Sequence, residues 1–202
     1  MRTLLILSCV LVSCAAQQGQ MLSPIEQDRA QLRLEVPDAV WEPIFFKLIN
    51  ERAKIARLDD LRTMVLPGDD LEIRVWMGFG VTALQGYVVR RNKGQWSALR
   101  IPAIRPHDRN SRVNVHLTPK SGWDQLWKSL TNENILGLPD SAKFPGIEKF
   151  PDGVSYVVEI NANRTYRTYM YGNPETQTAF NEARQMAKIA RVLSDEFGTD
   201  PH

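Results

Sequence analysis

The sequence predicts an α+β fold in which helices cover an antiparallel sheet of about six strands. The first observation is the spacing of apolar residues, which recur at every second position in some stretches and at helical spacing in others. The second is the order of these stretches: a helix, four strands, a helix, two strands and a last helix. Because strands joined by short turns pair antiparallel, this order predicts one sheet with helices packed on it.

Residues 23–36 precede the first long helix and fit two structures. Ser23-Pro24-Ile25-Glu26 has the form of a capping box with proline at the first helical position, which predicts a short helix. The residues after it alternate as a strand would, and Pro37 ends either element. The alternating apolar residues are Ala30, Leu32, Leu34 and Val36.

The first long helix is predicted over residues 41–58. Its apolar residues share one face and its charged residues lie opposite, as in a helix that buries one side. We therefore favour core packing over a partner-binding or membrane-lying face. Pro43 fits the first helical turn alone. The apolar face consists of Trp41, Ile44, Phe45, Leu48, Ile55 and Leu58.

Four strands are predicted between residues 70 and 117. In the first strand, apolar residues alternate with Glu72, Arg74 and Trp76. The second and third strands form a hairpin, because Asn92-Lys93-Gly94 offers a glycine that can adopt a positive φ between two apolar stretches. The fourth strand contains Val113, Val115 and Leu117.

The second half of the chain adds a helix, two strands and a last helix. Ser121 is placed to cap the helix that follows it, and Gly137 ends the helical pattern. Residues 154–160 and 166–170 alternate as two strands around a polar turn. Asn173-Pro174 is the predicted cap of the last helix. The apolar stripe of that helix is Phe180, Ala183, Ala187, Ala190, Leu193 and Phe197.

Residues 1–13 have the layout of a secretory signal peptide. Arg2 supplies a positive charge, residues 4–12 are apolar, and residues 13–16 are small, as expected at a cleavage site. The apolar run is too short to cross a bilayer, because a spanning helix needs about 20 apolar residues. The chain is therefore predicted to be exported.

Leu11-Val12-Ser13-Cys14 resembles the lipobox of bacterial lipoproteins. The resemblance implies cleavage before Cys14, attachment of a diacylglycerol to its sulfur, and acylation of the new amine by a chain such as palmitate. Each buried methylene contributes about 0.8 kcal/mol, so these chains would hold the protein on a membrane. Ala15 implies, by an enteric-type sorting rule, delivery to the outer membrane. The alternative is ordinary cleavage after Ala16, which gives a soluble exported protein.

Residues 14–22 are small and polar and are predicted to be a tether, followed by a single domain over residues 23–202. The only cysteines are Cys9 and Cys14, so this domain is expected to contain no disulfide and to depend on an ordinary core. The formal net charge of +2 gives no argument for nucleic-acid binding.

Loose motifs lie between residues 60 and 197: EIRVWMGFG at 72–80, Trp96 after the hairpin turn, and YRTY at 166–169 ahead of Asn173-Pro174. In these motifs the chain resembles uncharacterised exported or lipid-anchored bacterial proteins. The resemblance implies export and carries over no activity and no catalytic residue.

No catalytic residue, metal site or cofactor is predicted. GFGVTA at 78–83 matches the G-x-G-x-x-A form of a dinucleotide fingerprint. That fingerprint requires a helix after it and an acidic residue about 20 positions on, but a strand pattern follows it here and no acidic residue occurs between Glu72 and Asp108. Its glycines are expected to serve a bend or bulge. His107, Asp108 and His116 match no zinc spacing, and the arginines around them would repel a cation.

The predicted binding segment lies between Arg100 and Lys120. Arginine presents a planar fork that suits phosphate or carboxylate, so this segment is a candidate site for an anion or an acidic partner. The expected partners are the membrane, reached through the N-terminal lipid, and either an envelope protein or an anionic glycolipid. The candidate residues are Arg105, His107, Arg109 and Arg112.

Two further groups of residues would extend that surface. One is the basic cluster at the hairpin turn, and the other is a set of aromatic residues that would stack on a glycan or a peptide if their side chains face outward. The basic residues are Arg90, Arg91 and Lys93, and the aromatic ones are Trp76, Trp96, Tyr169 and Tyr171.

The sequence therefore predicts a lipid-anchored protein of the cell envelope, at the outer membrane and facing the periplasm or the cell surface. We expect a non-catalytic binding or assembly module. The alternatives are an envelope hydrolase whose site is assembled in space around His107 or His116, and an immunity-type protein that binds a delivered toxin.

Overall fold

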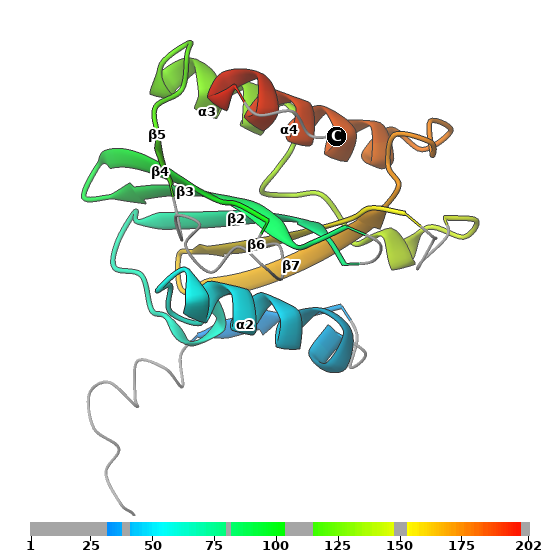
Figure 1. The fold of residues 1–202 in the computed structure, drawn as a ribbon, viewed down its shortest axis with the longest axis horizontal. Coiled ribbons are helices and arrows are strands. Elements are labelled where there is room, and N and C mark those ends of the chain that lie inside the picture. Colours follow the sequence, from blue (N-terminus) through cyan, green and yellow to red (C-terminus); the bar gives the residue numbers. More distant parts are fainter. Residues whose placement is uncertain (1–31, 38–40, 80–81, 104–114, 148–152, 199–202) are drawn as a thin grey trace, which may run out of the picture.

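The computed structural model describes residues 32–37, 41–79, 82–103, 115–147 and 153–198. In these residues seven strands form one sheet, with helices on both of its faces (Figure 1). The predicted α+β class is confirmed. The sheet differs from the prediction in two respects, because it has seven strands instead of about six and because it is mixed instead of purely antiparallel.

The strand order in the sheet is β1-β7-β6-β2-β3-β4-β5. All neighbouring strands are antiparallel except β1 and β7, which are parallel. Residues 30–36 were compatible with a helix or a strand, and within them β1 forms as a strand. Its partner β7 lies far along the chain. The bounds are β1 Arg33–Glu35, β2 Leu71–Gly78, β3 Gln85–Asn92, β4 Gln95–Ile101, β5 Val115–Leu117, β6 Ser155–Ala162 and β7 Thr165–Gly172.

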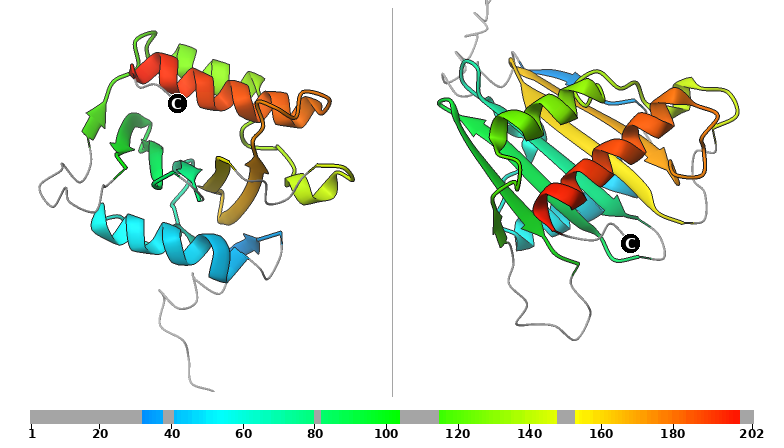
Figure 2. Two further views of the ribbon diagram at one scale, coloured as in Figure 1. Left: turned by 45° about the vertical axis from the view of Figure 1, so that its right-hand side comes forward. Right: turned by 90° about the horizontal axis from the view of Figure 1, so that it is seen from above.

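The helices lie in two layers. A π-helical turn η1 (Glu42–Phe46) leads into α2 (Lys47–Ile55) on one face of the sheet, whereas α3 (Trp123–Asn132) and α4 (Asn181–Phe197) lie side by side on the other (Figure 2). Two 3-10 turns, η2 (Leu61–Thr63) and η3 (Ser141–Lys143), connect these layers to the strands. None of the described helices is long and apolar enough to cross a membrane.

Two helices start differently from the prediction. Gly122, with φ 86°, is the N-cap of α3 and makes no side-chain cap, while the backbone N–H of Ser121 donates to Glu196 Oε2 at 2.8 Å. Asn173 does not cap α4, which begins eight residues later at Asn181. Instead Asn173 Oδ1 accepts a hydrogen bond from the backbone N–H of Val154 at 2.8 Å, so it fixes the entry into β6.

Two predicted turns are confirmed. Lys93 and Gly94 have φ of 49° and 79°, which places both central residues of the β3–β4 turn in the left-handed region that such hairpins require. Gly78 has φ 128° at the end of β2, and a Cβ there would lie 3.0 Å from Leu84 Cα, so this glycine serves a bend. Gly80 lies outside the described residues.

The alternation on β2 assigns its residues to two different cores. Leu71, Ile73, Val75 and Met77 pack in the cluster beneath α3 and α4. Glu72, Arg74 and Trp76 point to the opposite face, and all three are buried there. The α2 face therefore buries charged residues in the middle of the sheet.

One end of the sheet, which we call the hairpin end, brings together three points of the chain. Leu71, at the start of β2, pairs with Arg91 near the β3–β4 turn and with Ala162 near the β6–β7 turn. β1 begins at the same end, where the backbone N–H of Arg33 donates to Arg164 O at 3.0 Å. The chain that precedes β1 therefore joins the fold at the hairpin end.

Candidate functional site

Most of the predicted site residues cannot be placed. Cys14, the predicted lipid-attachment residue, and the four candidates Arg105, His107, Arg109 and Arg112 lie outside the described residues. At the borders of that segment, Arg100 is partly buried on β4, and His116 on β5 is exposed.

Three of the four predicted stacking residues are core residues. Trp76, Tyr169 and Tyr171 are each 0% exposed. The hydroxyl groups of the two tyrosines donate to the carbonyl oxygens of Ile135 and Pro139. Only Trp96 is partly exposed, so a stacking surface made of these four residues does not exist.

A buried ionic cluster lies on the α2 face of the sheet. The carboxylate of Glu72 accepts hydrogen bonds from Arg74 Nε at 2.7 Å and from Arg90 Nε at 2.6 Å. Arg90 Nη2 donates to the same carboxylate at 3.2 Å, and Arg74 Nη2 donates to the carbonyl oxygen of Asp59 at 2.9 Å. Both oxygens of Glu72 are therefore occupied, and Arg90 is held in one orientation by two hydrogen bonds.

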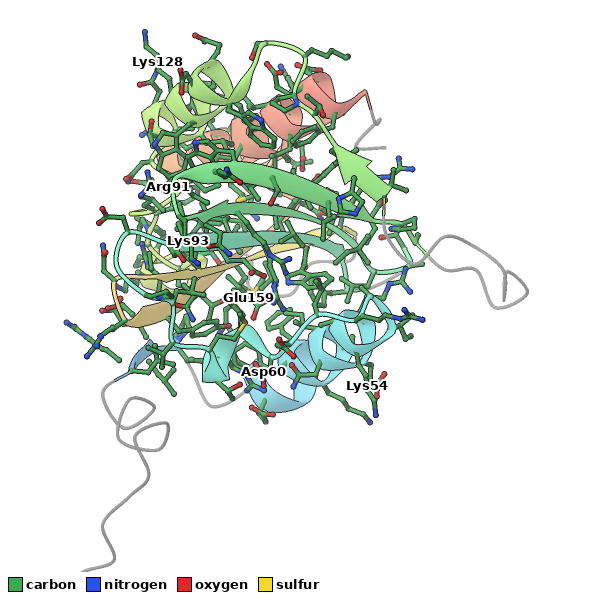
Figure 3. The ribbon with its side chains drawn as sticks, turned by 90° about the vertical axis from the view of Figure 1, so that its left-hand side faces the viewer. Lys54, Asp60, Arg91, Lys93, Lys128 and Glu159 are labelled. Atoms are coloured by element: carbon green, nitrogen blue, oxygen red, sulfur yellow. The ribbon has the colours of Figure 1, made fainter. Side chains whose placement is uncertain are left out.

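Glu159 is a second buried acid on this face, directly opposite Arg74 in the β2–β6 register. Its carboxyl group accepts hydrogen bonds from Trp76 Nε1 at 2.6 Å and from the Tyr166 hydroxyl at 2.8 Å. Burial raises the pKa of Glu159, and the charge of Arg74 and the two donors oppose that shift. Figure 3 shows Glu159 inside the molecule, between the sheet and the segment that carries Asp60.

This polar layer connects the sheet to the chain after α2. Asn161 Nδ2 donates to the carbonyl oxygens of Leu61, the first residue of η2, and of Met64, which follows η2, at 2.9 and 2.7 Å. Together with the bond from Arg74 to Asp59, these contacts position the segment that forms one wall of a pocket. The carboxylates of Glu72 and Glu159 and the amide nitrogen of Asn161 thus bond to other groups of the protein, which is a structural role, while Asn161 Oδ1 has no hydrogen-bond partner in the described structure.

The pocket lies at the hairpin end and has a cavity volume of about 240 Å³. We call it the hairpin-end pocket. Its polar lining residues are Arg57, Asp59, Asp70, Glu72, Arg90, Arg91 and Asn92. Arg91 is held by hydrogen bonds from Nε and Nη2 to the carbonyl oxygen of Asp69, at 3.2 and 2.9 Å.

A second feature, the tryptophan surface, consists of Trp96, Trp123 and Trp127. All three side chains are partly exposed. The rings of Trp96 and Trp123 are nearly parallel, with 10° between their planes and 6.3 Å between centroids, and Trp127 lies 5.1 Å from Trp96. Three of the five tryptophans of the chain therefore gather where β4 meets α3.

The side chain of Arg91 lies on the same face of the sheet as the tryptophan surface, because Arg91 pairs with Leu71 and Trp96, whereas Arg90 pairs with Glu72 on the α2 face. Its guanidinium carbon lies 5.4 Å from the centroid of the Trp96 ring, within the range of a cation–π contact, and the same residue lines the hairpin-end pocket. Lys93 and Lys128 are exposed. Figure 3 shows Lys128, Arg91 and Lys93 one below another on the same side of the molecule.

Sequence reasoning identified Trp96, Arg90 and Arg91 but did not propose Trp123 or Trp127 as binding residues. Both pack against the core, and both side chains are partly exposed. The signal that could have found them is the abundance of tryptophan next to a basic turn. Among the described residues, no group of three or more histidine, cysteine or acidic side chains could hold a metal ion.

A comparison of the chain with known protein families found no family model that matches it. A comparison with curated proteins likewise found no match.

Proposed function

We propose that this protein is a lipid-anchored protein of the cell envelope whose folded part is a non-catalytic binding module. The proposed anchor is Cys14, on the strength of the Leu11-Val12-Ser13-Cys14 sequence. The proposed binding surface is the tryptophan surface with the adjoining Arg91.

The observation that carries the binding role is the contact of Arg91 with the tryptophan surface. A binding site usually combines apolar or aromatic surface with a few oriented polar groups. Arg91 supplies a guanidinium that is oriented by hydrogen bonds to the carbonyl oxygen of Asp69 and that contacts Trp96. Tryptophan and arginine are also the residue types that contribute most to binding energy at interfaces.

The distribution of charge supports binding over catalysis. The two acids buried on the α2 face, Glu72 and Glu159, accept hydrogen bonds from neighbouring side chains of the protein itself. The charged groups that border the tryptophan surface are exposed or partly exposed. A partner can bind these exposed charged groups without disrupting the core.

The anchor is tested by the intact mass of the protein recovered from the membrane fraction of a bacterial host, beside the variant Cys14→Ala. We expect a chain that begins at Cys14 and carries acyl groups, and a variant that is not lipidated. A chain that begins at Gln17 without added mass contradicts the anchor and leaves a soluble exported protein.

The binding role is tested by crosslinking in the native envelope. We expect Trp123→Ala combined with Arg91→Gln to reduce the recovery of specific crosslinked partners at a temperature at which circular dichroism shows the variant to be folded. Arg184→Gln, an exposed substitution on α4, is the matched control. An unchanged set of partners in the double variant contradicts the proposed surface.

The predicted binding segment is tested in the same experiment. Arg105→Glu with Arg109→Glu is expected to weaken partner retention if that segment adds to the surface. His107→Ala and His116→Ala separate the binding module from the hydrolase alternative, which requires an imidazole base. Full function in both histidine variants favours the binding module.

A further inference from the structure

We propose that a second pocket, beside α4, binds a small zwitterion: a free amino acid or a dipeptide, with an ammonium group and a carboxylate. This inference goes beyond the proposed function, because it concerns another part of the molecule, and neither depends on the other. The pocket, which we call the α4 pocket, has a cavity volume of about 340 Å³. The residues that give it its chemistry are Tyr156, Asn173, Glu175, Ala187, Ala190 and Arg191.

The α4 pocket lies at the end of the sheet opposite the hairpin end. Val154 directly precedes β6, and Asn173 directly follows β7. These are the ends of the two strands that lie away from the β6–β7 turn. Figure 1 shows the β3–β4 turn at the left of the sheet and the chain between β7 and α4 at the right. The pocket is therefore separate from the tryptophan surface.

The wall formed by residues 173–176 is held in place by hydrogen bonds. The backbone N–H of Asn173 donates to the carbonyl oxygen of Val154 at 2.9 Å, and Asn173 Oδ1 accepts from the N–H of Val154 at 2.8 Å. The N–H and the hydroxyl of Thr176 both donate to the carbonyl oxygen of Asn173, at 3.0 and 2.9 Å. A wall that is ordered before the ligand arrives loses little conformational entropy on binding.

A buried tyrosine orients the acid of the pocket. Tyr156 pairs with Met77 and Tyr171 in the sheet, so its side chain lies on the α3 and α4 side. Its hydroxyl donates to Glu175 Oε1 at 2.7 Å. Burial and the Glu175 carboxylate raise the pKa of Tyr156, so the hydroxyl keeps its proton and remains a donor at neutral pH. Within the described residues, Glu175 has no other hydrogen-bond or ion-pair partner, so its Oε2 can accept from a ligand.

Arg191 supplies the opposite charge from α4. Ala187, Ala190 and Arg191 have i, i+3 and i+4 spacing, which places them on one face of the helix, and all three line the pocket. Arg191 is exposed and, in the part of the chain that the structure describes, its guanidinium has no hydrogen-bond or ion-pair partner. A guanidinium presents a planar fork that matches a carboxylate.

The charges of this cavity favour a zwitterion over a simple ion. Glu175 and Arg191 line the same cavity, and no ion pair joins them in the described structure. An anion that reached Arg191 would be repelled by Glu175, and a cation near Glu175 would be repelled by Arg191. A zwitterion satisfies both groups, because its ammonium group donates to the carboxylate while its own carboxylate accepts from the guanidinium.

Small side chains on α4 leave the room for this ligand. Ala187 is partly buried and Ala190 is buried, and each side chain ends at Cβ on the helix face that borders the cavity. Val154 adds a further apolar group to the lining. Binding sites combine such apolar surface with a few placed polar groups, so we expect the part of the ligand between its two charges to be aliphatic.

The test is isothermal titration calorimetry of the full mature protein, purified in detergent. The probes are leucine, leucyl-leucine, N-acetylleucine, which lacks the ammonium group, and leucinamide, which lacks the carboxylate. We expect at least one of the two zwitterions to bind about tenfold or more tightly than both blocked probes, because each blocked probe loses a charge-assisted contact. The tighter zwitterion shows whether the source is a free amino acid or a peptide. No measurable binding of either zwitterion, or equal affinity for a blocked probe, overturns the proposal.

Variants locate the binding. Arg191→Gln should lower the affinity for the tighter zwitterion about tenfold or more, and no lost internal contact can explain this, because the side chain has no described partner. Glu175→Gln should do the same, while its amide oxygen still accepts from Tyr156. Ala187→Leu should abolish binding by filling the cavity. Lys188→Gln, an exposed cation of α4 that does not line the pocket, is the matched control. Full affinity in all three pocket variants, or an equal loss in the control, overturns the site.

Discussion

The two faces of the central sheet are built from the same strands and yet have different interiors. Beneath α3 and α4, β2 contributes Leu71, Ile73 and Val75 to an apolar core. On the α2 side, the alternate residues of the same strand are Glu72, Arg74 and Trp76, which join a hydrogen-bonded network with Arg90 and Glu159. The same strand therefore contributes to two cores. One is stabilised by the packing of apolar side chains, and the other by hydrogen bonds and ion pairs between polar side chains.

This difference has consequences for stability. An apolar core is stabilised by the removal of apolar surface from water. This stabilisation is roughly proportional to the buried apolar area and does not depend on the orientation of the groups. A buried ionic network depends on every member being satisfied, because an unpaired charge in the interior retains its full desolvation cost. The losses of stability caused by substitutions on the two faces should therefore differ in size, in pH dependence and in additivity.

The largest expected effect is that of Arg74→Met. This change leaves Glu72 with one cationic partner and removes the charge opposite Glu159, so it should lower the free energy of unfolding by about 3–5 kcal/mol. Urea denaturation followed by circular dichroism measures the loss. Arg74→Met combined with Glu72→Leu and Glu159→Leu should recover much of it, because the buried acids are then gone as well.

Arg52 provides the matched comparison for that change. It is also a buried arginine, on α2, but its Nε and Nη2 have no hydrogen-bond partner in the described structure, and burial lowers its pKa. Arg52→Met should therefore be neutral or stabilising. If Arg52→Met costs as much as Arg74→Met, pairing is not what distinguishes the two arginines.

Gly86→Ala tests the packing of Trp76, which donates a hydrogen bond to Glu159 of the network. Gly86 lies opposite Trp76 in the β2–β3 register, and a Cβ there would come 2.9 Å from Trp76 Cε3. Overpacking of this kind should cost about 1–3 kcal/mol, measured by the same urea denaturation. Gly94→Ala is the control for loss of glycine at a position with open space, although its φ of 79° adds some strain there. An unchanged stability in Gly86→Ala contradicts the tight fit.

Glu159→Gln should change the pH dependence of stability more than its magnitude. Because the pKa of Glu159 is raised in the folded state, the acid binds its proton more tightly there than in the unfolded chain. Its favourable contribution is therefore complete below its ordinary pKa of 4.5 and is lost as pH rises through the folded-state pKa. The wild type should lose stability relative to the variant over that window, by at most about 1.4 kcal/mol per pH unit.

The measurement is a series of urea denaturations of wild type and Glu159→Gln at pH values from 4 upward. Glutamine mimics the protonated acid, because the Tyr166 hydroxyl can rotate to accept from the amide. A difference in stability that stays constant with pH would mean that folding leaves the pKa of Glu159 unchanged.

The smallest expected effect lies on the apolar face. Ile73→Val removes one buried methylene beneath α3 and α4 and should cost about 0.5–1.5 kcal/mol. No titratable side chain is removed, so this loss should be the same at every pH at which the protein is folded. A pH-dependent loss would contradict the separation of the two faces.

Local patterns predicted the elements of this fold better than their pairing. The alternation on β2, the Lys93-Gly94 turn and the bend at Gly78 depend on neighbouring residues, and the structure confirms them. The parallel pairing of β1 with β7 depends on residues more than 130 positions apart, and no local pattern specifies it. Asn173 looked like a helix cap because its side chain can accept a backbone hydrogen bond, but the donor is the backbone N–H of Val154, just before β6.

The candidate site was predictable only in part for the same reason. A basic hairpin turn with a tryptophan beside it can be found in the sequence at Arg90, Arg91 and Trp96. That Trp123 would lie parallel to Trp96, or that Asp59 would face the same cavity as Arg91, depends on how α3 and the chain after α2 pack on the sheet. Polar residues alternating with apolar ones on β2 also gave no sign that α2 covers them.

Finally, the two outermost strands of the sheet, β1 and β5, are three residues long. An exposed strand edge is a template for pairing with another copy, and a short, charged edge offers few backbone groups for that purpose. β1 carries Arg33 and Glu35, which form an ion pair with each other at 3.0 Å. If the proposed lipid anchor concentrates the protein on a membrane, edges of this kind would keep neighbouring copies from joining into a continuous sheet.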